Sequence, residues 1–124
     1  MSIRAGGRSV GFSDFAPYEK RQSLKFTNSL ATIDLRDGAY CEITLNSDVE
    51  SLLILHWLPS PIVNRISLEI INPGFYRIDL SLAKWNGGGT PPRITPNGVD
   101  LIELMSHKGG QPGSIIGRMW ANIR

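Results

Sequence analysis

The stretch Lys84–Asp100 reads KWNGGGTPPRITPNGVD; it follows the alternating run 76–82 and leads into the apolar run 99–106. It combines three consecutive glycines with three prolines, Pro91, Pro92 and Pro96. Proline lacks a backbone donor and fixes φ, while glycine adopts angles that other residues avoid, so no helix can run through these residues. The stretch is therefore predicted to be a structured connection between two strands, and Trp85 at its start is predicted to anchor it to the core.

On both sides of this stretch, apolar and polar residues alternate with a period of two, which is typical of half-exposed strands. The strands predicted in this way cover residues 30–36, 39–46, 66–70, 76–82, 99–106 and 114–123. Asp37-Gly38 separates the first two and favours a tight hairpin. Asn72-Pro73-Gly74 separates the next two and favours a turn.

The run Leu52–Leu58 gives conflicting signals. Ser47–Glu50 before it fits a capping box, which favours a helix. The run itself is apolar on every side and ends at Pro59, and its seven residues are short for a helix but typical of a strand buried on both faces. We predict a strand here, with a single helical turn near Ser47 as the alternative.

These segments amount to about seven short strands without a convincing helix, which predicts an all-β fold. A chain of 124 residues is long enough for one hydrophobic core. We therefore predict a single-domain antiparallel β-sandwich in residues 29–124, preceded by an extended arm in residues 1–28.

The predicted arm is basic and rich in aromatic residues. It carries five basic and two acidic side chains, whereas the rest of the chain carries eight basic and nine acidic ones. Such an arm suits an acidic protein surface or nucleic acid, or is an ordinary solvated terminus. Its aromatic residues favour docking onto the body or a neighbouring subunit. The candidate docking residues are Arg4, Arg8, Phe12, Phe15, Tyr18, Lys20 and Arg21.

Side chains that carry catalysis or hold metals are few and scattered. Cys41 is the single cysteine, which excludes an intramolecular disulfide, and its alternation with Ile43 predicts a buried side chain. His56 lies in the most apolar run and is expected to be a hydrogen-bonded core or interface residue. Asp100 and Glu103 have opposite phases on a strand and cannot form an acid/base pair. We found no nucleophile-elbow, phosphate-loop or zinc-protease motif, and we expect no enzyme, no cofactor and no metal site.

Other ligand classes leave weak signals. Trp57, Trp85 and Trp120 are candidate sugar platforms, Trp85 being the best candidate for partial exposure, but tryptophans in small β-domains more often anchor the core. Basic residues of the body do not cluster, so nucleic-acid binding is not expected. No apolar run approaches the roughly 20 residues that span a bilayer, and the N-terminus lacks the apolar segment of a secretory signal. We therefore expect that the protein does not contact a membrane. We also expect that it assembles in the cytoplasm of the producing cell.

The string Lys84-Trp85-x-x-Gly88-x-Thr90-Pro91-x-x-x-Thr95, followed by Gly98-Val99-Asp100, resembles a signature of small β-domains in virion surface proteins of tailed bacteriophages. A Gly-Gly turn and a final strand with an internal glycine complete the signature, here Gly109-Gly110 and residues 114–123. The resemblance extends weakly upstream to about Ile33 and does not cover the first 28 residues. Its structural motif residues are Lys84, Trp85, Gly88, Thr90, Pro91, Thr95, Gly98 and Asp100. Asp100 is expected to bind the backbone of the preceding loop.

The resemblance implies a non-enzymatic structural protein of the virion that acts through protein contacts. Domains of this kind usually trimerise, so we expect a homotrimer that also contacts the major capsid protein or other virion proteins. One placement is a capsid decoration (cement) protein whose arm reaches across the capsid lattice. The other is a tail-fibre or baseplate protein that binds a host surface glycan. A single domain with a short basic arm favours capsid decoration.

Overall fold

The structure, a computed structural model, describes residues 21–123 except 25, 28, 87 and 88. Its strands are β1 (Arg21–Leu24), β2 (Phe26–Thr27), β3 (Leu30–Asp34), β4 (Tyr40–Thr44), β5 (Ser51–Leu55), β6 (Asn64–Asn72), β7 (Gly98–Ser106) and β8 (Ile116–Trp120). A short 3-10 helix, η3 (Leu35–Asp37), follows β3, and the described residues contain no α-helix. The predicted all-β class is confirmed.

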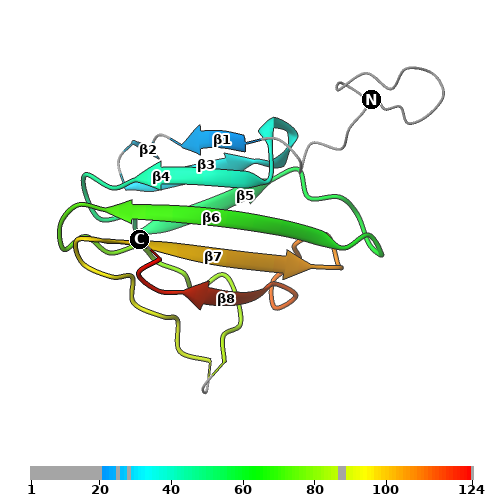
Figure 1. Ribbon diagram of the computed structural model, residues 1–124. Coiled ribbons are helices and arrows are strands. Elements are labelled where there is room, and N and C mark those ends of the chain that lie inside the picture. The colour runs from blue at the N-terminus through cyan, green and yellow to red at the C-terminus, as the bar shows by residue number, and fades with distance from the viewer. Residues whose placement is uncertain (1–20, 25, 28, 87–88, 124) are drawn as a thin grey trace.

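The strands form two sheets, with β3 and β5 behind β4 and β6 in Figure 1. The larger sheet has the order β1-β4-β6-β7-β8 and the smaller one the order β2-β3-β5. Strand β4 is parallel to both β1 and β6, and β3 is parallel to β5. The β2–β3, β6–β7 and β7–β8 pairs are antiparallel. The sheets are thus mixed, and the prediction of antiparallel pairing is wrong for three strand pairs.

The connection at Asp37-Gly38 explains the parallel β3–β5 and β4–β6 pairs. Strands β3 and β4 lie in different sheets, and η3 carries the chain from one to the other. The Asp34 carboxylate accepts a hydrogen bond from the Arg36 backbone N–H at 3.0 Å, and Leu35 is buried in the core. The predicted hairpin is therefore wrong. Because β3, β4, β5 and β6 alternate between the sheets, β5 returns in the direction of β3, and β6 in that of β4.

Strands β6 and β7 form the centre of the larger sheet, where Leu68 pairs with Ile102. Their buried side chains are Asn64, Ile66, Leu68, Ile70 and Asn72 on β6, and Asp100, Ile102, Leu104 and Ser106 on β7. Ile33 of β3 and Ile54 of β5 belong to the same hydrophobic core. Cys41 of β4 is fully buried in it, as its alternation predicted.

Two predicted strands differ from the observed structure. Residues 76–82 form no strand, and Ile78 makes only an isolated bridge with Val49. The Asp79 carboxylate accepts a hydrogen bond from the Ser81 N–H at 2.8 Å, and this turn ends the extended backbone. A strand forms in the run 52–58 as predicted, but β5 covers residues 51–55 and leaves out residues 56–58. It is an edge strand, and Leu53 is 45% exposed. It is therefore not buried on both faces.

The described body begins earlier than predicted, because β1 and β2 fall inside the range 1–28 and join one sheet each. An Arg21 guanidinium nitrogen lies 2.6 Å from the Glu42 carboxylate. The Gln22 side-chain amide donates to the backbone oxygens of Asp34 (2.9 Å) and Gly38 (2.6 Å). Strand β1 is thus held by polar contacts, and its sequence does not show the alternation of apolar residues by which the other strands were predicted. The other candidate docking residues, Arg4, Arg8, Phe12, Phe15, Tyr18 and Lys20, lie outside the described residues.

Candidate functional site

The start of the signature loop extends the larger sheet beyond β8. The Lys84 N–H donates to the Ile115 oxygen at 2.8 Å, and the Gly117 N–H donates to the Lys84 oxygen at 2.9 Å. Trp85 is buried beneath Gly117, and its indole N–H donates to the Leu80 oxygen at 2.8 Å. The Lys84 side chain stays exposed. Trp85 is thus the predicted core anchor.

The end of the signature loop is organised around the carboxylate of Asp100, which is 1% exposed. It accepts hydrogen bonds from the Thr95 N–H (2.5 Å), the Thr95 hydroxyl (2.7 Å) and the Asn122 N–H (2.7 Å). A Cβ on Gly98 would lie 2.7 Å from the Thr95 methyl carbon, so glycine is required for this approach. The expectation that Asp100 binds the backbone of the preceding loop is confirmed.

The other signature residues are less engaged. Thr90 is exposed and Pro91 is half-buried, while Gly88 lies outside the described residues. Ile94 lies between Pro91 and Asp100 in the sequence, and its side chain is buried. Sequence reasoning did not single it out. The described signature residues that make specific contacts therefore hold the loop onto the body, and they do not line either pocket described below.

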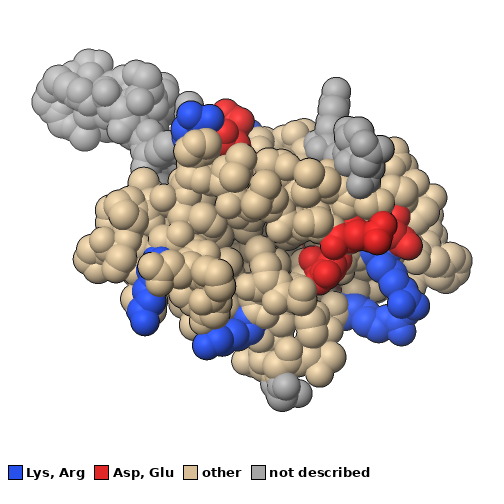
Figure 2. Space-filling view, turned by 180° about the vertical axis from the view of Figure 1, so that it is seen from behind, with Lys and Arg blue, Asp and Glu red and all other residues tan. Residues whose placement is uncertain are grey.

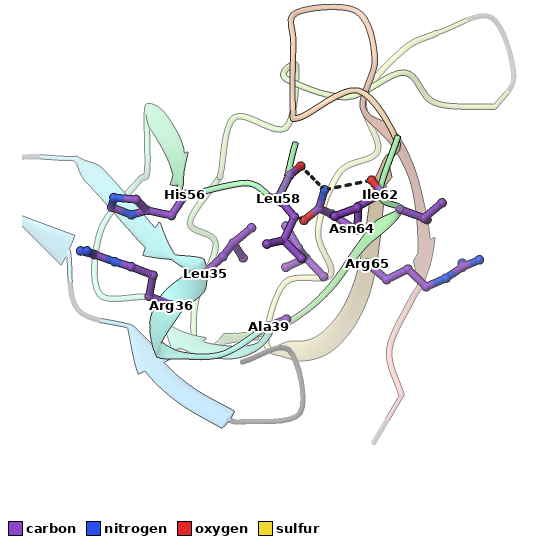
Figure 3. A pocket seen from close by; sticks show the side chains of 10 residues that line it. Leu35, Arg36, Ala39, His56, Leu58, Ile62, Asn64 and Arg65 are labelled. Carbon is purple, nitrogen blue, oxygen red and sulfur yellow. Dashed lines mark hydrogen bonds between the residues drawn. The ribbon is translucent and has the colours of Figure 1, made fainter. Parts of the chain in front are cut away.

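A pocket of about 360 Å³ opens at the end of the molecule where η3 turns (Figure 3). Its lining residues are Leu35, Arg36, Ala39, His56, Leu58, Ile62, Val63, Asn64, Arg65 and Ile66. Its mouth is apolar, since Leu58, Ile62 and Val63 are 40–50% exposed. Such large apolar side chains grouped around one hollow mark a site that another group can cover. We call this hollow the arch pocket.

Asn64 holds the wall of the arch pocket. Its side-chain oxygen accepts a hydrogen bond from the Leu58 N–H at 3.0 Å, and its amide donates to the Leu58 oxygen at 2.9 Å. Figure 3 shows this amide between the backbone of Leu58 and Ile62. Sequence reasoning missed these residues; the apolar pair Ile62-Val63 directly after Pro61 was the available signal.

The rim of the arch pocket carries charge. The Asp34 carboxylate bonds the Arg36 guanidinium at 2.8 Å and the His56 Nδ1 at 2.9 Å. The hydrogen bonds that Arg36 donates to Asp34 hold the pKa of Asp34 well below its usual range, and the same bonds raise the pKa of Arg36. His56 is hydrogen-bonded as expected, but its side chain is 45% exposed, so of the two expected positions, core or interface, the core one is wrong. Its backbone turns out of β5 with φ of 65°, which carries the ring to the surface.

The tryptophans differ in exposure. Trp85 is 8% exposed, Trp57 is half-buried against Gly110, and Trp120 is 42% exposed. The expectation that Trp85 is the best candidate for exposure is therefore wrong, because its ring lies under β8. The Arg118 guanidinium stacks 4.7 Å from the centre of the Trp120 ring. Arg118 also lines a second hollow of about 370 Å³ with Arg65, Asn86, Glu103, Met105, Ile116 and Gly117.

Within residues 21–123, apart from the four gaps, no group of three or more histidine, cysteine or acidic side chains could hold a metal ion. The described part of the chain also has no helix of the length and hydropathy needed to cross a bilayer. Burial raises the pKa of the Cys41 thiol to about 12. This thiol is therefore neutral at ordinary pH and is a poor nucleophile.

Comparison with family models, curated proteins and solved structures found no match to this chain.

Proposed function

We propose that this protein is a non-enzymatic structural protein of a tailed-bacteriophage virion, and that it decorates the capsid surface. The proposal rests on the signature of residues 84–100 and on an uncovered apolar surface of the body. In this proposal the two sheets are the layers of a β-sandwich. The sandwich stands outward from the capsid, and the N-terminal residues attach it to the major capsid protein.

A pair of exposed leucines on the outer face of the smaller sheet is the observation that carries the proposal. Leu30 of β3 is 40% exposed and Leu53 of β5 is 45% exposed. Strand β5 is an edge, and in the described residues no further strand pairs with it. Exposed apolar edge strands are usually protected, since they invite pairing with another chain. We therefore place the contact between copies of a homotrimer at β5.

The charge distribution supports a protein contact on this side. Figure 2 views the molecule from behind Figure 1, on the side of the smaller sheet. Charged side chains lie at the upper left, along the lower part and in a group right of the centre, and the upper central area between them shows no charged side chain. Depletion of charge in a central area with a polar rim is typical of protein interfaces.

The alternative is a tail-fibre or baseplate protein that binds a host glycan. The hollow beside Arg118 and the half-exposed Trp120 favour it, because an aromatic face next to arginine, asparagine and glutamate side chains suits a sugar. In this version Trp120, rather than Trp85, is the platform. Trp120→Ala would then abolish binding to host cells, while Trp57→Ala would not.

Placement is tested with gold-labelled antibody on intact virions, viewed by negative-stain electron microscopy. Label over the head supports capsid decoration, and label confined to the tail overturns it in favour of the alternative. Residues 1–20 are the segment to delete, because deletion to residue 28 would remove β1 and β2. The shortened protein is expected to keep its fold and lose attachment to capsids. Attachment that survives the deletion would contradict the role of the arm.

The homotrimer is tested separately by light scattering of the purified protein. Leu53→Glu places a charge on the apolar face and is expected to give monomers. Phe75→Glu is the matched control, since Phe75 is 79% exposed and lies in the turn after β6. If both variants keep the mass of the unchanged protein, the contact does not lie at β5.

A further inference from the structure

We propose that the arch pocket binds residues 14–19 of its own chain, the segment Asp-Phe-Ala-Pro-Tyr-Glu. This inference concerns contacts within one chain and does not depend on the place of the protein in a virion. It combines the position of β1, the apolar mouth of the pocket and the charges around it.

The chain enters the described body beside the arch pocket. In the larger sheet Arg21 pairs with Tyr40, which pairs with Ser67, so β1 begins level with Ala39 and Ile66 of the pocket wall. Figure 1 shows the start of β1, η3 and the start of β6 at the same end of the molecule. The Gln22 amide fixes β1 there by donating to the Asp34 and Gly38 oxygens.

The segment is long enough to reach the pocket. The starts of β1 and β6 are two strand spacings apart, or about 10 Å. Tyr18 precedes Arg21 by three residues and Phe15 precedes it by six, so their extended reach is about 10 and 20 Å. Both aromatic rings can therefore enter the pocket without any change in the body.

The chemistry of the segment matches that of the pocket. Phe15, Pro17 and Tyr18 are the kind of side chains that a pocket of about 360 Å³ with an apolar mouth buries. Asp14 and Glu19 flank them, while the rim offers basic side chains. These are Arg36 and His56 on one side and Arg65 on the other (Figure 3).

Charge complementarity decides between this segment and the rest of the arm. Arg36 and His56 already bond Asp34, but no ion pair engages Arg65 among the described residues. Residues 1–12 carry Arg4 and Arg8 and no acidic side chain, so the same rim would repel them. The acidic part of the arm is thus the part that the pocket suits.

The test is a disulfide trap in the full-length chain. Ala16→Cys is combined with Val63→Cys at the mouth of the pocket, or with Phe75→Cys as the control at the other end of β6. Val63 and Phe75 are 50% and 79% exposed, so neither change disturbs the core, and Cys41 is fully buried. Under mild oxidation we expect an intrachain 16–63 disulfide that forms at a rate independent of protein concentration. A 16–75 disulfide should form about tenfold more slowly or not at all.

A second comparison separates docking from mere tethering. In the 16–63 background, Phe15→Ser together with Tyr18→Ser is expected to slow trapping about tenfold, because the buried aromatic contacts are lost. Phe12→Ser, outside the segment, should leave the rate unchanged. An unchanged rate in the double serine variant overturns the proposal. So does a disulfide between two chains, which would assign the pocket to the arm of a neighbouring copy.

Discussion

Gly117→Ala tests how the signature loop is anchored. A Cβ at this position would lie 2.6, 2.8 and 3.0 Å from the Cη2, Cζ3 and Cζ2 atoms of Trp85. These contacts are shorter than packed carbon atoms allow, so the indole must move. The ring is 8% exposed and its N–H is bonded to the Leu80 oxygen, so movement disturbs both packing and a buried hydrogen bond.

The expected cost follows from these two effects. Overpacking a filled core costs about 1–3 kcal/mol, and a lost hydrogen bond costs about 1 kcal/mol. We therefore expect Gly117→Ala to lower the free energy of unfolding by about 2–4 kcal/mol, a large share of the roughly 5–15 kcal/mol of a typical domain. Urea unfolding followed by far-ultraviolet circular dichroism measures it without relying on tryptophan fluorescence.

Trp85→Phe removes the outer ring atoms that the new Cβ would meet. The double variant is therefore expected to lose about 1–3 kcal/mol less unfolding free energy than the two single variants lose together. Gly113→Ala is the matched control, because Gly113 has φ of 82° and nothing within 4 Å of its Cβ position. It should cost about 1–2 kcal/mol through backbone strain and show no coupling to Trp85→Phe. Strict additivity in the first pair, or a Gly117→Ala cost under about 0.5 kcal/mol, would refute the reasoning.

Three further predictions concern polar and buried groups. Asp100→Ala leaves three donors without their acceptor and should lower the free energy of unfolding in urea by about 3 kcal/mol or more. Asp79→Ala, at the surface, should lower it by less than about 1 kcal/mol. Equal losses would contradict the buried role of Asp100. The lowered pKa of Asp34 means that the stability from its pairing with Arg36 is present above its unfolded pKa of about 4 and is lost as pH falls toward the folded pKa. Asp34→Asn should therefore flatten the decline of unfolding free energy below pH 4, and an unchanged slope would exclude this source of acid sensitivity. Cys41, whose thiol pKa is about 12, should not react with a thiol reagent at pH 8 until urea unfolds the protein, and rapid native labelling would show that the core opens.

For the candidate sites, the sequence predicted correctly the roles of residues whose contacts lie close along the chain. Trp85 and Asp100 were assigned to the core and to the loop backbone, and both lie there. The arch pocket was beyond its reach, because η3 and the segment from His56 to Ile66 meet through the parallel pairings of β3 with β5 and of β4 with β6. The exposure of Trp120 and the burial of Trp85 likewise depend on which segment passes beneath β8.

The amino-acid sequence by itself determined the β class and the buried face of most strands. The alternation of Ile66, Leu68 and Ile70 predicts the buried face of β6 because successive side chains of a strand point to opposite sides. Only the tertiary structure decided which strands pair and in which direction. The same alternation and the same Asp37-Gly38 turn serve a hairpin within one sheet or a crossing between two sheets. The choice depends on where Leu35 and the distant strand β6 find their packing partners, which no local pattern contains.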